Sequence, residues 1–313
     1  MKPLRIGTRG SALALWQANY FRDALQKTCG LASELVVIRT SGDQNVADPA
    51  QQIGVIGIFT KELEDSLLDG RADLAVHSMK DVPTEFSPHC RIATVFRRIE
   101  PCDALVSHGG EMLAQLPPGA KIGTSSLRRA SQLRLFRPDI QIAELRGNVD
   151  TRLRKVAAGE YDAIVLAKAG IDRLGLSSRI TEVLSPEIML PAVGQGALGV
   201  EFCEPRREEF KVLDLLMDQD TMRAVKAERA LLAEVQGGCR LPLGAWARVE
   251  NGAMVLDARV LSEDGAECIR GRAEKVCNSA ADAENLGRAV AAELLAAGAD
   301  RLLRIVGRSV GRA

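Results

Sequence analysis

The chain has 313 residues, of which 46% are hydrophobic and 26% are charged, a composition typical of a soluble globular protein with two or three compact domains. It carries 41 basic and 41 acidic residues, so it lacks the basic excess expected of a nucleic-acid-binding protein. No run of about 18 apolar residues marks a membrane span, and no apolar signal-peptide core opens the chain, so we expect a cytoplasmic protein.

The N-terminal part alternates between strand-like and helix-like segments. Apolar runs predict strands at 4–7, 34–40 and 72–77. Helices are predicted after Ser11, which is a good N-cap, and at 61–69, where Gly70 ends the helix. This β-α-β-α-β order predicts an α/β lobe with a mostly parallel, doubly wound sheet.

The pattern then restarts and predicts a second α/β lobe. The predicted strands and helices of this lobe are 103–107, 121–123, 127–136, 141–145, 149–158 and 161–167. The glycine-rich segment 191–201 follows and is typical of a crossing between lobes rather than of a helix.

The C-terminal third predicts a separate α+β domain with an antiparallel three-stranded sheet. The expected elements are a helix at 221–235, strands at 244–249, 254–261 and 267–276, and a last helix at 280–297. Asn251-Gly252 between the first two strands is a strong hairpin signal.

Polar and basic residues follow two strands of the second predicted lobe. Thr124, Ser126, Arg128 and Arg129 lie where a strand passes into a helix, which suits anion binding at a helix N-terminus. A plain serine cap with two solvated arginines explains this segment equally well. Arg146 and Arg152 repeat the pattern after the next strand, and ligands bind at the carboxyl ends of such strands. We therefore favour a small, multiply charged anion as ligand.

Similar chemistry occurs in the first predicted lobe, where Arg9 and Ser11 follow its first strand. Ser78 and Lys80, after the third strand, can bind carboxylates, and Asp81 is an acid among basic groups that could stabilise a developing cation. On local grounds alone, a turn cap before a proline is the better explanation of Asp81. His77 is expected to be a packed strand residue rather than a base or a metal ligand.

The seven cysteines are scattered without a C-x-x-C pair, which indicates neither a disulfide framework nor a metal site. Cys239 differs from the others because it follows Gly237-Gly238 in a tight loop. A small buried thiol is the commonest fate of a free cysteine, and the nearby Arg240 is the feature that favours a thiolate.

Eight segments in order resemble the porphobilinogen deaminase family, and the resemblance covers about residues 4–244. The segments are GTRGSALALWQA, FTKELE, ADLAVHSMKDVP, GTSSLRR, LRGNVDTRL, YDAIVLAKAGIDRLGL, LPAVGQGALGVE and AERALLAEVQGGCRLPLGA.

This resemblance implies that Cys239 carries a dipyrromethane cofactor, one per chain, through a thioether. It implies that Asp81 hydrogen-bonds pyrrole N–H groups and stabilises the cation left when ammonia departs. Phe59 matches an aromatic residue beside the cofactor, and Gln195 a residue in the active cleft. The positions that match acetate- and propionate-binding residues are Arg9, Ser11, Ser78, Lys80, Thr124, Ser126, Arg128, Arg129, Arg146, Arg152 and Arg173.

The implied activity is that of a transferase of tetrapyrrole biosynthesis, which joins four porphobilinogen molecules head to tail and releases hydroxymethylbilane. No metal, nucleic acid or membrane is implied, and the expected state is a monomer. The implied architecture is two hinged lobes, as in periplasmic binding proteins, with a third domain that bears the cofactor. We expect the first lobe to comprise residues 1–98 and 197–217, the second lobe 99–196, and the third domain 218–313.

Two other functions fit part of the sequence. A ligand-binding or regulatory protein with two α/β lobes would explain Ser126 and Arg146 but not the Gly-Gly-Cys loop. A thiol transferase would use Cys239 as nucleophile but lacks an identifiable His-Asp pair.

The segment before FTKELE departs from the family, because Gln52 and Ile56 stand where lysines are expected. We expect this loop to bind anions less strongly by charge, and to pack apolar side chains instead.

Overall fold

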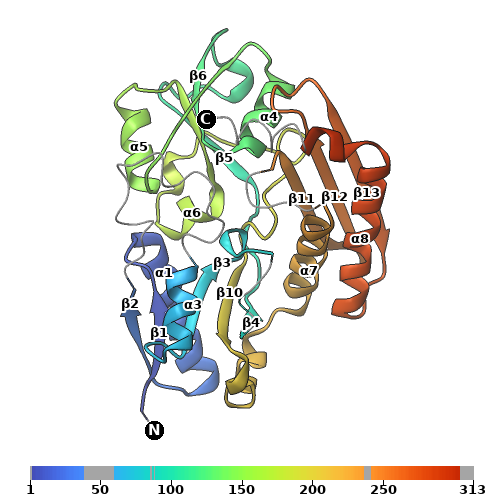
Figure 1. Cartoon of the computed structure of the whole chain (residues 1–313). Coiled ribbons are helices and arrows are strands. Elements are labelled where there is room, and N and C mark those ends of the chain that lie inside the picture. Colours follow the sequence, from blue (N-terminus) through green and yellow to red (C-terminus); the bar gives the residue numbers. More distant parts are fainter. Residues whose placement is uncertain (1, 39–59, 85–86, 88, 236–240, 304–313) are drawn as a thin grey trace. The chain divides into compact units, whose positions relative to one another are not determined.

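A computed structural model describes residues 2–38, 60–84, 87, 89–235 and 241–303 (Figure 1). The chain divides into two compact units. The first unit is Met1–Ile99 with Ala197–Met222, and the second is Glu100–Gly196 with Arg223–Ala313. None of the helices in the described ranges combines the length and apolar character needed to span a membrane.

The first unit is built on a five-stranded sheet with the order β2-β1-β3-β10-β4. The strands are β1 (Leu4–Thr8), β2 (Ser33–Val37), β3 (Leu74–Ser78), β4 (Cys90–Val95) and β10 (Leu198–Cys203). β1 pairs in parallel with β2 and β3, whereas β10 runs antiparallel between β3 and β4. Part of the segment expected to be an irregular crossing is therefore strand β10.

Capping residues set the helix ends of this unit. Helix α1 (Ala12–Ala24) begins at Ser11, whose hydroxyl accepts a hydrogen bond from Ala14 N at 3.3 Å, as predicted. It continues into a π-helical turn, Leu25–Cys29. Helix α3 is Lys61–Leu68, and short 3-10 segments cover Met79–Asp81 and Glu204–Leu216.

Side chains that alternate along the strands form a core on each face of this sheet. Leu74 and Val76 of β3 pack in a cluster with Phe21 of α1. Ala75, between them, packs instead with Leu63 of α3. This period-2 alternation is what a sheet covered on both faces requires.

The second unit contains a sheet of the same pattern, with the order β7-β6-β8-β5-β9. Its strands are β5 (Asp103–Ser107), β6 (Lys121–Gly123), β7 (Gln141–Ala143), β8 (Ala163–Ala167) and β9 (Glu182–Val183). β6, β7 and β8 are parallel, and β5 is antiparallel to both of its neighbours. The helices are α4 (Leu127–Phe136), α5 (Val149–Ala157) and α6 (Lys168–Arg173), and 3-10 turns cover Leu113–Gln115 and Ser177–Arg179.

One predicted strand of this unit, 141–145, ends earlier than expected. The backbone N–H and C=O of Leu145 bond to the hydroxyl of Ser125, at 3.1 and 2.9 Å, instead of to a neighbouring strand. A side chain thus replaces the sheet at the point where the chain turns toward α5.

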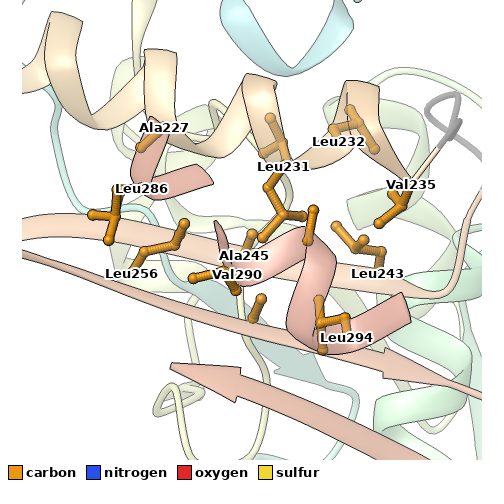
Figure 2. Packing of buried hydrophobic residues seen from close by; sticks show 14 of the residues in the cluster. Ala227, Leu231, Leu232, Val235, Leu243, Ala245, Leu256, Leu286, Val290 and Leu294 are labelled. Carbon is orange, nitrogen blue, oxygen red and sulfur yellow. The ribbon is translucent and has the colours of Figure 1, made fainter. Parts of the chain in front are cut away.

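The rest of the second unit forms the predicted antiparallel sheet, β11 (Leu243–Glu250), β12 (Ala253–Leu261) and β13 (Cys268–Lys275). Asn251 and Gly252 both have positive φ, 50° and 84°, as the predicted hairpin turn requires. Helices α7 (Gln219–Glu234) and α8 (Ala280–Ala296) contribute apolar side chains to a core with β11 and β12 (Figure 2). The predicted fold class is confirmed: two α/β sheets of one topology, and an antiparallel α+β element.

Candidate functional site

A hollow lies in the first unit, at the carboxyl ends of β1 and β3. Four of the predicted site residues line it, namely Arg9, Ser11, Ser78 and Asp81. Arg9 and Ser11 follow β1, whereas Ser78 ends β3 and Asp81 ends the 3-10 turn after it. Because β1 and β3 are parallel neighbours, their carboxyl ends meet, which brings these residues together.

The hydroxyls of Ser11 and Ser78 both accept hydrogen bonds from α1. Ser11 caps α1, and Ser78 Oγ accepts a hydrogen bond from Gln17 Nε2 at 2.8 Å. Gln17, on α1, is 4% exposed and also lines the hollow. Sequence reasoning missed Gln17, because a polar residue in an amphipathic helix carries no distinctive signal.

Asp81 is exposed, and its carboxylate makes no hydrogen bond or ion pair with any other described residue. The turn that contains it is closed by the backbone, because Val82 N donates to Met79 O at 3.4 Å. The turn-cap explanation of Asp81 therefore gains no support, and its carboxylate is available to a ligand in the hollow. Lys80 precedes it and is partly buried.

His77 lines the hollow, but its ring is buried and Nε2 lies 2.9 Å from Glu201 Oε2 of β10. It is thus a packed strand residue, as expected. Nearby, burial of Glu64 and the charge of Glu201 raise the pKa of the Glu64 carboxyl to about 7, although His77 opposes the shift. This acidic pair, in which Glu201 is buried and Glu64 is partly buried, was not foreseen, because its members come from a helix and a strand far apart in the sequence.

In the second unit the hydroxyls of Thr124 and Ser126 accept hydrogen bonds from backbone N–H groups around the start of α4. Ser126 Oγ accepts from Arg129 N at 3.4 Å, and Thr124 Oγ1 accepts from Ser126 N at 3.2 Å. The serine-cap part of the plain interpretation is therefore correct for Ser126. Each oxygen retains a hydroxyl hydrogen that a ligand could use.

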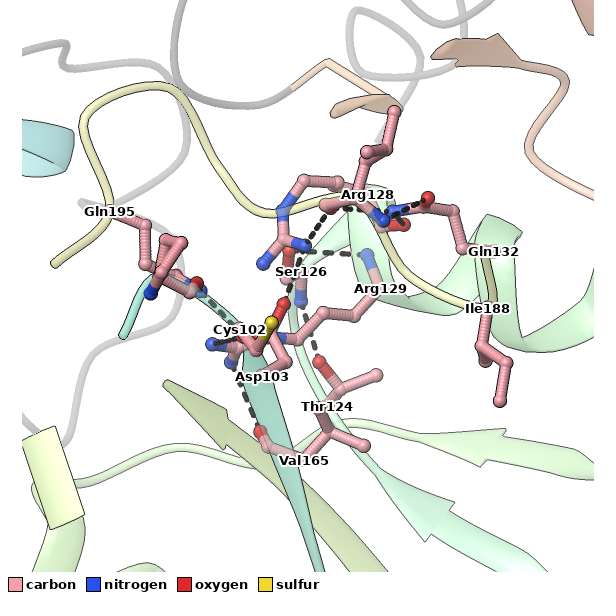
Figure 3. Close-up of polar contacts among 12 residues, drawn as sticks. Cys102, Asp103, Thr124, Ser126, Arg128, Arg129, Gln132, Val165, Ile188 and Gln195 are labelled. Atoms are coloured by element: carbon pink, nitrogen blue, oxygen red, sulfur yellow. Dashed lines mark hydrogen bonds and ion pairs between the residues drawn. The ribbon is translucent and has the colours of Figure 1, made fainter. Parts of the chain in front are cut away.

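Arg128, Arg129 and Gln195 converge on Asp103, the first residue of β5 (Figure 3). All four side chains are buried, and Asp103 and Gln195 are 0% exposed. The two arginines are therefore not the solvated pair of the alternative interpretation. Sequence reasoning missed Asp103, although a carboxylate at the head of the apolar strand DALVS was a usable signal.

The other predicted arginines make different contacts. Arg146 Nε donates to Glu144 Oε1 at 2.6 Å, and the two side chains are 40% and 62% exposed, respectively. Arg152 Nε donates to the carbonyl of Gly147 at 2.7 Å. Arg173, which is 7% exposed, donates from Nη2 to the carbonyl of Gly196 at 2.8 Å.

Several predicted features lie outside the described residues: Cys239, Phe59, and the loop with Gln52 and Ile56. Among the cysteines that are described, burial raises the pKa of Cys90 and of Cys102 to about 12. Such thiols are poor nucleophiles. Within the described ranges, no group of His, Cys, Asp or Glu side chains could hold a metal ion.

The sequence matches two family models along most of its length. Residues 4–211 match "porphobilinogen deaminase, dipyrromethane cofactor binding domain", and residues 222–296 match "porphobilinogen deaminase, C-terminal domain". A porphobilinogen deaminase of Syntrophobacter fumaroxidans is 46% identical over 307 residues, covering 98% of each chain. One of Roseiflexus castenholzii is 49% identical over 301 residues, covering 96% of this chain and 98% of its own.

Among solved structures, the periplasmic VFT2 domain of BvgS from Bordetella pertussis is 15% identical. In a double mutant of that domain the match covers 68% of this chain and 85% of the other, with a TM-score of 0.43. A putative sulfonate-binding protein, SsuA of Methylobacillus flagellatus, is 14% identical, covering 75% and 68%, with a TM-score of 0.40. Similarity at this level says nothing about function.

Proposed function

The chain belongs to the porphobilinogen deaminase family, and we propose that it joins four porphobilinogen molecules head to tail, with loss of ammonia, and releases hydroxymethylbilane. The growing chain is held on a dipyrromethane cofactor linked to Cys239. The observation that carries this proposal is the hollow in which Asp81, a carboxylate with no described partner, lies with Arg9 and the hydroxyls of Ser11 and Ser78.

The residues around the hollow fit the cofactor and the substrate. Both molecules are pyrroles that carry acetate and propionate groups, so they present carboxylates and N–H donors. The Arg9 guanidinium and the hydroxyls of Ser11 and Ser78 can bind carboxylates. Asp81 can accept hydrogen bonds from pyrrole N–H groups. When bound, the cofactor supplies the free α-carbon of its terminal ring as the nucleophile.

Asp81 is the residue to which we assign the chemical step. Loss of ammonia from a porphobilinogen molecule leaves a cation that is conjugated with the pyrrole N–H. A carboxylate beside that N–H stabilises the cation more strongly than the neutral substrate, so it lowers the barrier instead of merely tightening binding. Because Asp81 has no described partner to release, it meets this charge without a rearrangement.

The arginines neutralise the substrate carboxylates. Arg146 and Arg152 can exchange their present partners for a carboxylate, since an exposed ion pair such as Arg146–Glu144 is worth at most about 1 kcal/mol. Lys80, Arg173, Phe59 and the residues around Asp103 complete the binding set that the family resemblance supports. We further propose that the enzyme acts as a monomer in the cytoplasm, which light scattering and cell fractionation test.

Asp81→Ala tests the assignment of the chemical step. We expect ammonia release and bilane formation to be lost, while porphobilinogen still binds, because the arginines remain. Asp81→Glu should keep a small part of the activity. The matched control is Asp69→Ala, which removes a surface aspartate of the same unit that is paired with Arg71. Near-normal kcat in Asp81→Ala would rule out this role.

A further inference from the structure

Asp103 is the buried centre of a hydrogen-bonded cluster in the second unit. Its Oδ2 accepts from Arg128 Nη1 at 2.7 Å. Its Oδ1 accepts from Arg129 Nη2 at 2.8 Å, from Arg129 Nε at 3.1 Å, and from Gln195 Nε2 at 3.1 Å. Both carboxylate oxygens are therefore used (Figure 3), and the Asp103 side chain is 0% exposed.

The arginines are also held from their other sides. Arg128 Nη1 donates to the carbonyl of Leu190 at 2.7 Å, and Arg129 Nη1 to the carbonyl of Val165 at 3.0 Å. A planar guanidinium held by a carboxylate and a carbonyl has little freedom to rotate. The direction in which each arginine presents its remaining N–H donors is therefore fixed before any ligand arrives.

The charges of this cluster do not cancel. Two guanidinium groups, 5% and 7% exposed, share the single carboxylate of Asp103. Burial lowers the pKa of Arg128, and the charge of Arg129 lowers it further, while Asp103 opposes both effects. Buried charge of one sign is costly, so the cluster favours an anionic group as a further partner.

Asp103 also ties together three segments that are remote in sequence. Arg128 and Arg129 lie 25 and 26 residues away, in the first turn of α4, and Gln195 lies 92 residues away. Gln195 Nε2 donates in addition to the carbonyl of Pro101 at 2.7 Å. One carboxylate thus links the start of α4 and the segment that contains Gln195 to the start of β5.

We propose that Asp103 is a positioning residue of the reaction, whose carboxylate holds Arg128, Arg129 and Gln195 in the arrangement that receives the carboxylates of the cofactor and substrate. The inference rests on the proposed function. Asp103 touches neither ligand itself. It acts through the arginines, and a displacement of about 1 Å in such groups can cost a large factor in rate.

The experiment compares Asp103→Asn and Asp103→Glu with wild type, with Asp139→Asn as control. Asp139 pairs with Arg137 just beyond the other end of α4, at 2.7 Å through each oxygen, but on the surface. For each protein we would measure melting temperature, the mass of covalently bound pyrrole, and kcat and KM for porphobilinogen per cofactor-bearing molecule.

The sign of the change in KM separates positioning from charge. Removing the negative charge of Asp103 makes the cluster more positive, so a purely electrostatic role predicts a lower KM in Asp103→Asn. Positioning predicts that kcat/KM falls by about ten-fold or more, with a higher KM, or that the folded variant does not acquire the cofactor. Asp103→Glu, which keeps the charge but moves it by one methylene, should fall between Asn and wild type. Asp139→Asn should match wild type.

A folded Asp103→Asn with a lower KM, or with unchanged kcat and KM, overturns the proposal. If Asp103→Asn does not fold, Asp103→Glu decides: a several-fold loss of kcat/KM at normal melting temperature and cofactor content supports positioning, and wild-type kinetics overturn it. Wild-type protein that consumes no porphobilinogen would instead contradict the proposed function, so the two failures are distinguishable.

Discussion

Replacing Asp73 with asparagine should destabilise the first unit by an amount that depends on pH. The Asp73 carboxylate is 9% exposed and accepts hydrogen bonds from Arg5 N at 2.8 Å, from Arg5 Nε and Nη2 at 3.0 Å, and from Arg206 Nη1 at 2.6 Å. Burial alone would raise the pKa of Asp73, but these hydrogen bonds outweigh it and lower the pKa from 3.8 to about 2. That shift corresponds to about 2 kcal/mol, at about 1.4 kcal/mol per pKa unit.

The pH dependence follows from the direction of the shift. Because the pKa of Asp73 is lower in the folded state, its contribution is present above the unfolded-state pKa near 4 and is lost as the pH falls toward 2. Urea unfolding of Asp73→Asn should therefore show a loss of about 2 kcal/mol at pH 6. The difference from wild type should shrink between about pH 4 and pH 2, where Asp73 of the wild type becomes neutral as well.

Asp69→Asn is the control for this experiment, since Asp69 also pairs with an arginine but on the open surface. It should change the free energy of unfolding much less than Asp73→Asn. An Asp73→Asn protein as stable as wild type at pH 6 would refute the reasoning, and so would a loss that stays constant down to pH 2.

Three further changes have defined outcomes. Arg146→Gln should raise KM for porphobilinogen and weaken its dependence on salt, because one screened attraction is removed; an unchanged salt slope would exclude Arg146 from substrate binding. Gly287→Val should lower the melting temperature clearly, since even a Cβ at this position would lie 2.1 Å from the carbonyl oxygen of Ala227 where α8 meets α7; wild-type melting would show that the helices can separate at no cost. Ile56→Lys should lower KM, by the roughly 0.2–1 kcal/mol of an exposed ion pair; a strong loss of activity would mean that Ile56 is a packing contact.

The features that the sequence predicts well are those that depend on neighbouring residues. Ser11 caps α1 because a serine before an apolar helical pattern can bond the free N–H groups of the first turn. The Asn251-Gly252 turn follows from the backbone conformations these residues tolerate. The apolar run 72–77 likewise predicted a buried strand, and β3 is buried from Leu74 to His77.

Features that depend on distant parts of the chain were not predictable from local pattern. β10 pairs with both β3 and β4, although all strands of the second sheet lie between β4 and β10 in the sequence. The ion pairs of Arg128 and Arg129 with Asp103 could not be predicted from the two adjacent arginines, because an exposed and a buried pair of arginines have the same local sequence. The four residues at the hollow were named from the family resemblance, since on local grounds alone a turn cap was the better explanation of Asp81.

The covalent link at Cys239 is the most direct test of the central claim. Intact-protein mass spectrometry of the purified wild-type chain, followed by peptide mapping, should find the added mass of one dipyrromethane on the peptide that contains Cys239. Incubation with porphobilinogen should then add further masses in steps of one pyrrole unit. An unmodified Cys239, or a pyrrole adduct on a different cysteine, would contradict the account.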